Sequence, residues 1–168
     1  LYWAQKYPEE VESIIGLDMS LPESYSDLEI DSKLLNLIYA SSKSGIIRII
    51  PKISQSEAIK YGTLTEEEKA IYEDLFYKQT MNRTMVNEMM EIKSSAEKVK
   101  SKEYPNIPYL LFVSNGEGTG FSKEEWDQFQ KDFAETNNQV QMIELDSPHY
   151  LHNHEYERIS REIRDFLG

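Results

Sequence analysis

The chain has 168 residues, and 30 acidic against 18 basic side chains give it a formal net charge of −12. That length suits one ordinary domain, and the negative charge argues against nucleic acid, whose phosphates require clustered Lys and Arg. Hydrophobic residues at 39% and aromatic residues at 11% exclude a disordered acidic tail. The absence of cysteine excludes disulfides, thiolate metal sites and Cys nucleophiles. No apolar run approaches the ~20 residues that span a bilayer, and we expect a cytoplasmic protein.

Residues 1–27 predict the end of a helix followed by a buried strand. The stretch Leu1–Tyr7 is apolar and helix-like but has neither an initiator Met nor a polar N-cap, which is typical of a trimmed chain or of one cut inside a helix. A break follows at Pro8. The run Val11–Asp18 then has an apolar, β-branched centre, as expected of a strand covered on both faces. Any signal or anchor would lie upstream of these residues.

Residues 28–104 predict a helical insertion. A first amphipathic helix is expected to break within Ser41–Gly45. The apolar run Ile46–Ile50 fits either a strand or a short helix. Thr65–Glu68 has the pattern of a capping box that opens a further helix, and apolar residues at three- and four-residue spacing predict another helix near Thr84–Lys102.

Residues 105–168 predict strand, helix, strand and helix. Pro108–Ser114 and Val140–Leu145 have the buried-strand pattern, and Ser122–Glu125 is a second capping box between them. A last helix carries its apolar face near Ile159. Strands that alternate with helices predict the α/β class and a parallel sheet with right-handed crossovers. Residues 28–104 would then form a cap between two core segments, 1–27 and 105–168.

Polar residues follow each of the three predicted strands. In open α/β sheets the chemistry lies beyond the carboxyl ends of the strands, and here those ends carry Asp18, Glu117 and His149. His149 is the candidate general base because imidazole titrates near neutrality. A lone histidine is more often a satisfied loop residue, but the position of His149 at a strand end favours the general base. Glu117 is the first candidate to accept the Nδ1 proton of His149. Asp18 is the competing acid, or a residue that caps the following loop.

Other site chemistry has weaker support. Gly16–Ser20 resembles a strand-to-helix elbow in which Asp18 would be the nucleophile. The sequence contains no Gly-x-Ser-x-Gly motif, so it has no serine elbow. It also contains no phosphate-binding loop motif. The histidines His149, His152 and His154 match no zinc-binding spacing. We therefore expect neither a metal nor a cofactor.

These segments resemble the C-terminal half of an α/β-hydrolase with a helical cap. LYWAQKYPEEVESIIGLDMSLPESY resembles the helix after the nucleophile elbow and the sixth strand, and GIIRIIP resembles a short cap helix. IPYLLFVSNGE resembles the seventh strand with its acid-bearing loop, and SPHYLHNHEYERISREIRDFL resembles the histidine loop and last helix. The resemblance implies a partial α/β-hydrolase fold, with parallel strands, flanking helices and an inserted helical cap.

The resemblance also implies the roles of individual residues. His149 matches the catalytic histidine, and Glu117 falls where the family usually has its acid, more often Asp than Glu. Asp18 stays open as the acid, since some members place it after the sixth strand. The nucleophilic serine and the oxyanion-hole segment have no match and would precede Leu1.

These roles imply a hydrolase that cleaves a small ester, thioester or amide through an acyl-enzyme. The chain alone would be inactive, and the exposed edge of its first strand would pair with the missing N-terminal segment or with a second copy. Two alternatives remain open: a non-enzymatic binding or interaction module, and a hydrolase of dehalogenase or epoxide-hydrolase type with Asp18 as nucleophile.

Overall fold

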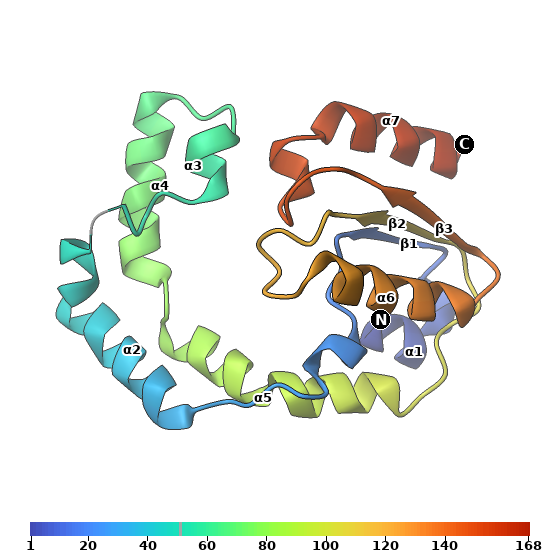
Figure 1. Cartoon of the computed structure of the whole chain (residues 1–168), viewed down its shortest axis with the longest axis horizontal. Helices are drawn as coiled ribbons and strands as arrows, with labels where there is room; N and C mark the ends of the chain where they lie inside the picture. The colour runs from blue at the N-terminus through green and yellow to red at the C-terminus, as the bar shows by residue number, and fades with distance from the viewer. Residues whose placement is uncertain (51) are drawn as a thin grey trace. The chain divides into compact units, whose positions relative to one another are not determined.

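The computed structural model describes residues 1–50 and 52–168, and it contains a parallel three-stranded sheet (Figure 1). The strands β1 (Ile14–Leu17), β2 (Tyr109–Val113) and β3 (Val140–Glu144) lie in the order β1-β2-β3. Ile14 is in register with Tyr109, which is in register with Val140. The predicted strands and their parallel order are confirmed. Pro51, at the end of the apolar run that resembles a cap helix, lies outside the described residues.

The side chains of β2 form the middle of two hydrophobic layers, because successive residues of a strand point to opposite faces. Leu110 and Phe112 face the layer that holds Ile159 of α7 (Tyr156–Leu167). Tyr109 and Leu111 face the layer that includes Phe133 of α6 (Lys123–Glu135). The helices α6 and α7 therefore cover opposite faces of the sheet (Figure 1). All five residues of β2 are buried, as expected for a strand between two helical layers.

The start of α6 is set by a capping box, as predicted. The Ser122 hydroxyl accepts from the Glu125 backbone N–H at 3.3 Å, and the Glu125 carboxylate accepts from the Ser122 N–H at 3.0 Å. Two orphan donors of the first turn are thereby satisfied. The same arrangement joins Thr65 and Glu68 at the start of α4 (Glu66–Gln79). Both predicted capping boxes are confirmed.

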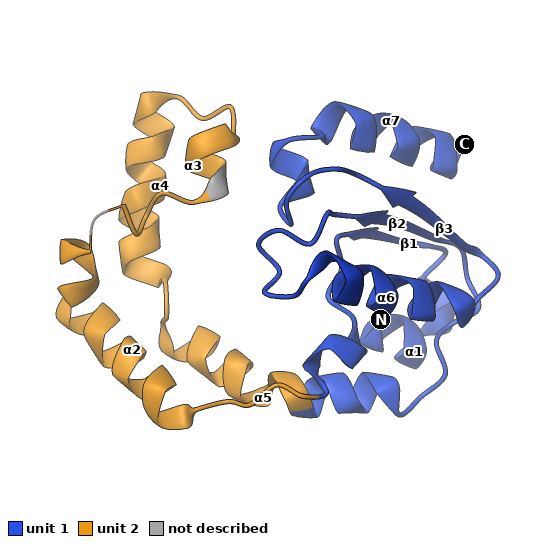
Figure 2. Cartoon of the chain, in the orientation of Figure 1, with its two compact units in different colours: residues 1–26, 94–168 blue, residues 27–93 orange. Residues whose placement is uncertain are grey.

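The chain divides into two compact units, one of residues 1–26 and 94–168 and the other of residues 27–93 (Figure 2). The second unit is helical: it holds α2 (Ser32–Ser44), the 3₁₀ helix η3 (Ile46–Ile49), α3 (Glu57–Tyr61), α4 and the first part of α5 (Arg83–Lys100). The apolar run is thus helical over residues 46–49 and extended only at Ile50. The predicted cap of residues 28–104 extends further along the chain than this unit, since residues 94–104 belong to the unit that contains the sheet.

The first helix of the second unit ends where the sequence predicts. The break is expected within Ser41–Gly45, and α2 continues to Ser44 with Gly45 as its C-cap. The Ser41 hydroxyl donates to the Leu37 carbonyl at 2.9 Å, and the Ser44 hydroxyl donates to the Ser41 carbonyl at 3.0 Å. These bonds satisfy the hydroxyls within the helix. The helix ends at Gly45, whose φ of 78° is the left-handed conformation common at C-termini.

The short helical segments of the first unit are α1 (Tyr2–Lys6) and the 3₁₀ helices η1 (Pro8–Glu10), η2 (Pro22–Tyr25) and η4 (Leu151–Asn153). Strand β1 forms one edge of the sheet and pairs only with β2 among the described strands. Leu17 on this edge strand is 41% exposed. Pairing of that edge with another segment or a second copy stays a prediction. None of the described helices has the length and apolar character required to cross a bilayer.

Candidate active site

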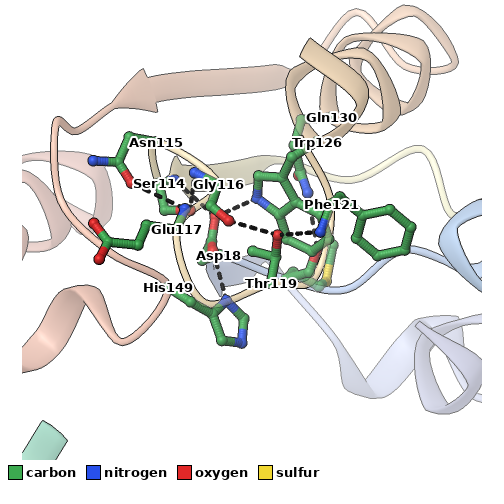
Figure 3. A network of polar contacts seen from close by, with 11 residues as sticks. Asp18, Ser114, Asn115, Gly116, Glu117, Thr119, Phe121, Trp126, Gln130 and His149 are labelled. Carbon is green, nitrogen blue, oxygen red and sulfur yellow. Dashed lines mark hydrogen bonds and ion pairs between the residues drawn. The ribbon is translucent and has the colours of Figure 1, made fainter. Parts of the chain in front are cut away.

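Asp18 marks the point at which β1 ends and the candidate site begins. Its backbone N–H donates to the Phe112 carbonyl at 2.8 Å, which continues the ladder between β1 and β2 by one residue. Its φ of 51° then turns the chain out of the sheet. Residues other than glycine adopt this left-handed conformation uncommonly, and Asp is among those that tolerate it best. The turn leaves the Asp18 carboxylate among the residues that follow β2 and β3 (Figure 3).

The structure brings Asp18 and His149 together. Oδ2 of Asp18 lies 2.6 Å from Nδ1 of His149, and these residues are 131 positions apart in the sequence. The Asp18 side chain is fully buried, whereas 26% of the His149 side chain is exposed. A carboxylate at Nδ1 keeps the proton of a neutral imidazole on that nitrogen and leaves a lone pair on Nε2. His149 thus has the tautomer and the exposure of a general base.

The other carboxylate oxygen of Asp18 is held by two donors. Oδ1 accepts from the Ser114 backbone N–H at 2.7 Å and from the Trp126 indole N–H at 2.8 Å (Figure 3). Burial alone would raise the pKa of Asp18, but the hydrogen bonds from His149, Ser114 and Trp126 outweigh it and hold that pKa below its ordinary value. Asp18 is therefore ionised at neutral pH.

The lowered pKa of Asp18 makes the stability of the chain depend on pH. A carboxyl group whose pKa is lower in the folded state contributes stability above its ordinary pKa of about 4, and this contribution is lost as the pH falls through the lowered value. We expect the urea midpoint to fall on acidification below pH about 4, and to fall less steeply in Asp18→Asn, whose amide does not titrate. Urea unfolding followed by circular dichroism at several pH values measures both slopes, and equal slopes would contradict the assignment.

The side chain of Glu117 does not take the position expected of the catalytic acid. Glu117 is exposed, and no hydrogen bond or ion pair joins its carboxylate to His149; only its backbone carbonyl accepts from the His149 N–H, at 2.8 Å. The flanking Gly116 and Gly118 have φ values of 86° and 88°, conformations that suit glycine. The turn that they form directs the Glu117 carboxylate away from the imidazole (Figure 3). The acid that contacts His149 is Asp18, the competing candidate.

Hydrogen bonds between two loops hold His149 at the site. Besides the bond between His149 and Glu117, the Asn115 N–H donates to the Ser147 carbonyl at 3.0 Å. The Asn115 amide donates to the Asp146 carboxylate at 3.1 Å. The loop after β2 thus positions the histidine loop through its backbone. In the described part of the chain no group of three or more His, Cys, Asp or Glu residues could hold a metal ion.

Two residues of the site were not identified from the sequence. Trp126 directly follows the predicted capping box Ser122–Glu125, and its indole N–H contacts Asp18. Ser114 ends the second predicted strand, and its backbone N–H contacts the same carboxylate while its hydroxyl accepts from the Gly116 N–H at 3.0 Å. One signal for Trp126 exists in the sequence: a buried tryptophan requires an acceptor for its N–H, and an acid at a strand end is a candidate.

The comparisons with solved structures define the class of fold. The crystal structure of DBJA covers 99% of this chain with a TM-score of 0.56 and 14% identity, and the chain covers 63% of that structure. The haloalkane dehalogenase DbeA-M1 loop variant from Bradyrhizobium elkanii has a TM-score of 0.55 and 20% identity, with 99% of this chain and 62% of that one covered. With three parallel strands and flanking helices, the chain has a partial α/β-hydrolase fold.

Comparison with curated sequences identifies a relative of this chain, but it does not assign the chain to a family. The chain is 29% identical over 175 residues to the uncharacterized protein YbdG of Bacillus subtilis, with 99% of this chain and 54% of YbdG covered. The chain thus spans about half the length of this curated relative. No family model matches it.

Proposed function

We propose that Asp18 and His149 are the acid and base of a hydrolase active site that cleaves a small ester, thioester or amide through an acyl-enzyme. The observation that carries the proposal is the 2.6 Å contact between Oδ2 of Asp18 and Nδ1 of His149 at the carboxyl end of a parallel sheet. The His149 side chain is partly exposed, and Nε2 is the ring nitrogen that Asp18 does not contact. The partial α/β-hydrolase fold supports this type of chemistry but does not specify it.

In the proposed reaction the nucleophile is a serine hydroxyl from a segment outside these 168 residues. His149 accepts the hydroxyl proton at Nε2 while the serine oxygen bonds to the carbonyl carbon of the substrate. Asp18 stays ionised and stabilises the imidazolium. The imidazolium then gives its proton to the leaving group, and His149 activates the water that hydrolyses the acyl-enzyme.

The elbow-like sequence around Asp18 suggests that its carboxylate could be a nucleophile. The geometry of the site gives that role less support than the role of the catalytic acid. A nucleophilic carboxylate needs an oxygen that can reach the substrate carbon. Asp18 is 1% exposed, and its two oxygens together accept three hydrogen bonds. Such a carboxylate is suited to orient the histidine, as an ionised group that neither attacks nor transfers a proton.

A comparison of two polypeptides tests the proposal. Hydrolysis of p-nitrophenyl acetate is measured for the 168-residue chain and for a full-length polypeptide that includes it, each with and without a serine-directed fluorophosphonate. We expect hydrolysis only by the longer polypeptide, inhibition by the fluorophosphonate, and a label that mass spectrometry locates on a serine outside this chain. Hydrolysis by the chain alone that resists the fluorophosphonate and is lost in Asp18→Asn would instead support an Asp nucleophile.

A further inference from the structure

The helix α6 contacts the turn that carries Asp18 through two side chains one helical turn apart. Trp126 donates its indole N–H to Oδ1 of Asp18 at 2.8 Å, and Gln130 donates its amide to the Met19 carbonyl at 3.0 Å. Both Trp126 and Gln130 are 1% exposed. Residues at positions i and i+4 of a helix share one face. This face of α6 therefore lies against the residues that immediately follow β1.

Trp126 contacts both members of the proposed acid–base pair. Its N–H is bonded to the Asp18 carboxylate, and its ring lies perpendicular to the His149 imidazole, with centroids 6.0 Å apart (Figure 3). The ring of Phe121 stacks on the ring of Trp126. Their centroids lie 5.8 Å apart, and their planes are inclined by 22°. The capping box at Ser122 fixes the start of the helix four residues earlier. The orientation of the indole is thus determined by packing on several sides.

The position of this donor matters because a carboxylate can rotate about the bond between Cβ and Cγ. One donor on Oδ1, the Ser114 N–H, would leave the plane of the carboxylate free to turn about that contact. A second donor from a different direction restricts the plane, and Oδ2 then faces Nδ1 of His149. Hydrogen bonds to an ionised carboxylate are also stronger than those between neutral groups.

We propose that Trp126 is a positioning residue, whose indole N–H holds the Asp18 carboxylate in the orientation that keeps the proton of His149 on Nδ1. The inference rests on the proposed function, since it assigns Trp126 to the same site. Trp126 itself contacts no reacting atom, and its effect passes through Asp18.

The first test uses Trp126 unaltered and needs no activity. In a Trp3→Phe background, Trp126 is the remaining tryptophan of the chain, and its indole N–H resonance is followed by ¹H–¹⁵N NMR. We expect this resonance to shift when Asp18→Asn is introduced, and to shift on acidification into the range where Asp18 is protonated. A folded Asp18→Asn variant in which the resonance does not move would overturn the inference.

The second test removes the donor and keeps an aromatic ring. In Trp126→Phe, ¹⁵N spectra of the imidazole should show a larger fraction of His149 with its proton on Nε2 than in the unaltered chain. In a full-length polypeptide, kcat should fall about tenfold or more while KM changes little, because the ionised Asp18 carboxylate loses a charge-assisted hydrogen bond that orients it. The matched control is Trp3→Phe, since Trp3 is 58% exposed and its N–H contacts Glu10.

The outcomes separate this inference from the proposed function. An unchanged tautomer and an unchanged kcat in a folded Trp126→Phe variant would overturn the positioning role. Absence of any hydrolysis in the full-length polypeptide would overturn the proposed function, whereas the two NMR measurements would still decide whether Trp126 orients the pair. Thermal unfolding of each variant establishes that it is folded.

Discussion

Asp18→Asn is expected to lower kcat for ester hydrolysis about 10⁴-fold in a full-length polypeptide. The asparagine has one acceptor oxygen, and the Ser114 and Trp126 N–H groups would retain it, since both bond to Oδ1. The amide NH₂ would then face Nδ1 of His149 as a donor. Nδ1 would have to act as the acceptor, which places the imidazole proton on Nε2 and removes the lone pair that accepts the nucleophile's proton.

The matched control for this prediction is Glu117→Gln. Glu117 is an acid in the loop that contacts the histidine, but its side chain is exposed and only its backbone carbonyl bonds to His149. The substitution leaves that carbonyl in place, so kcat should stay within about threefold, as expected for an exposed side chain outside the site. Steady-state kinetics with p-nitrophenyl acetate measures both variants. A large loss in Glu117→Gln together with a small loss in Asp18→Asn would return the role of the acid to Glu117.

His149→Ala is expected to lower kcat by about 10²–10⁴-fold, the usual contribution of a general base. The variant removes the imidazole that accepts the proton at Nε2 and leaves Asp18 bonded to Ser114 and Trp126. The same kinetic assay measures this effect, and circular dichroism establishes that the variant is folded.

His152→Ala provides the control for this histidine. His152 lies three residues further along the chain, in η4, and is exposed; its ring lies beside that of Tyr150, with ring centroids 6.1 Å apart. Its kcat should therefore match that of the unaltered protein. Hydrolysis that survives unchanged in His149→Ala would show that the Asp18–His149 pair is not catalytic.

Several features of the fold follow from local patterns in the sequence. The apolar runs that became β1, β2 and β3 could be located because a strand buried on both faces carries consecutive apolar side chains. The capping boxes at Thr65 and Ser122 could be located because their bonds join residues three positions apart. The break expected within Ser41–Gly45 could be located because Gly45 adopts the left-handed conformation that commonly ends a helix.

The sequence by itself identified His149 as the candidate base and limited the candidate acid to Glu117 or Asp18, because all three follow predicted strands. Only the tertiary structure decided which acid contacts the histidine. The distance between residues 18 and 149 depends on the pairing of β1 with β2 and of β2 with β3, and the direction of Glu117 depends on the backbone of two flanking glycines. The capping box Ser122–Glu125, likewise, predicts the helix that carries Trp126 but not that the indole N–H contacts a carboxylate 108 positions away. Contacts of this kind are set by packing between distant segments, which no local pattern encodes.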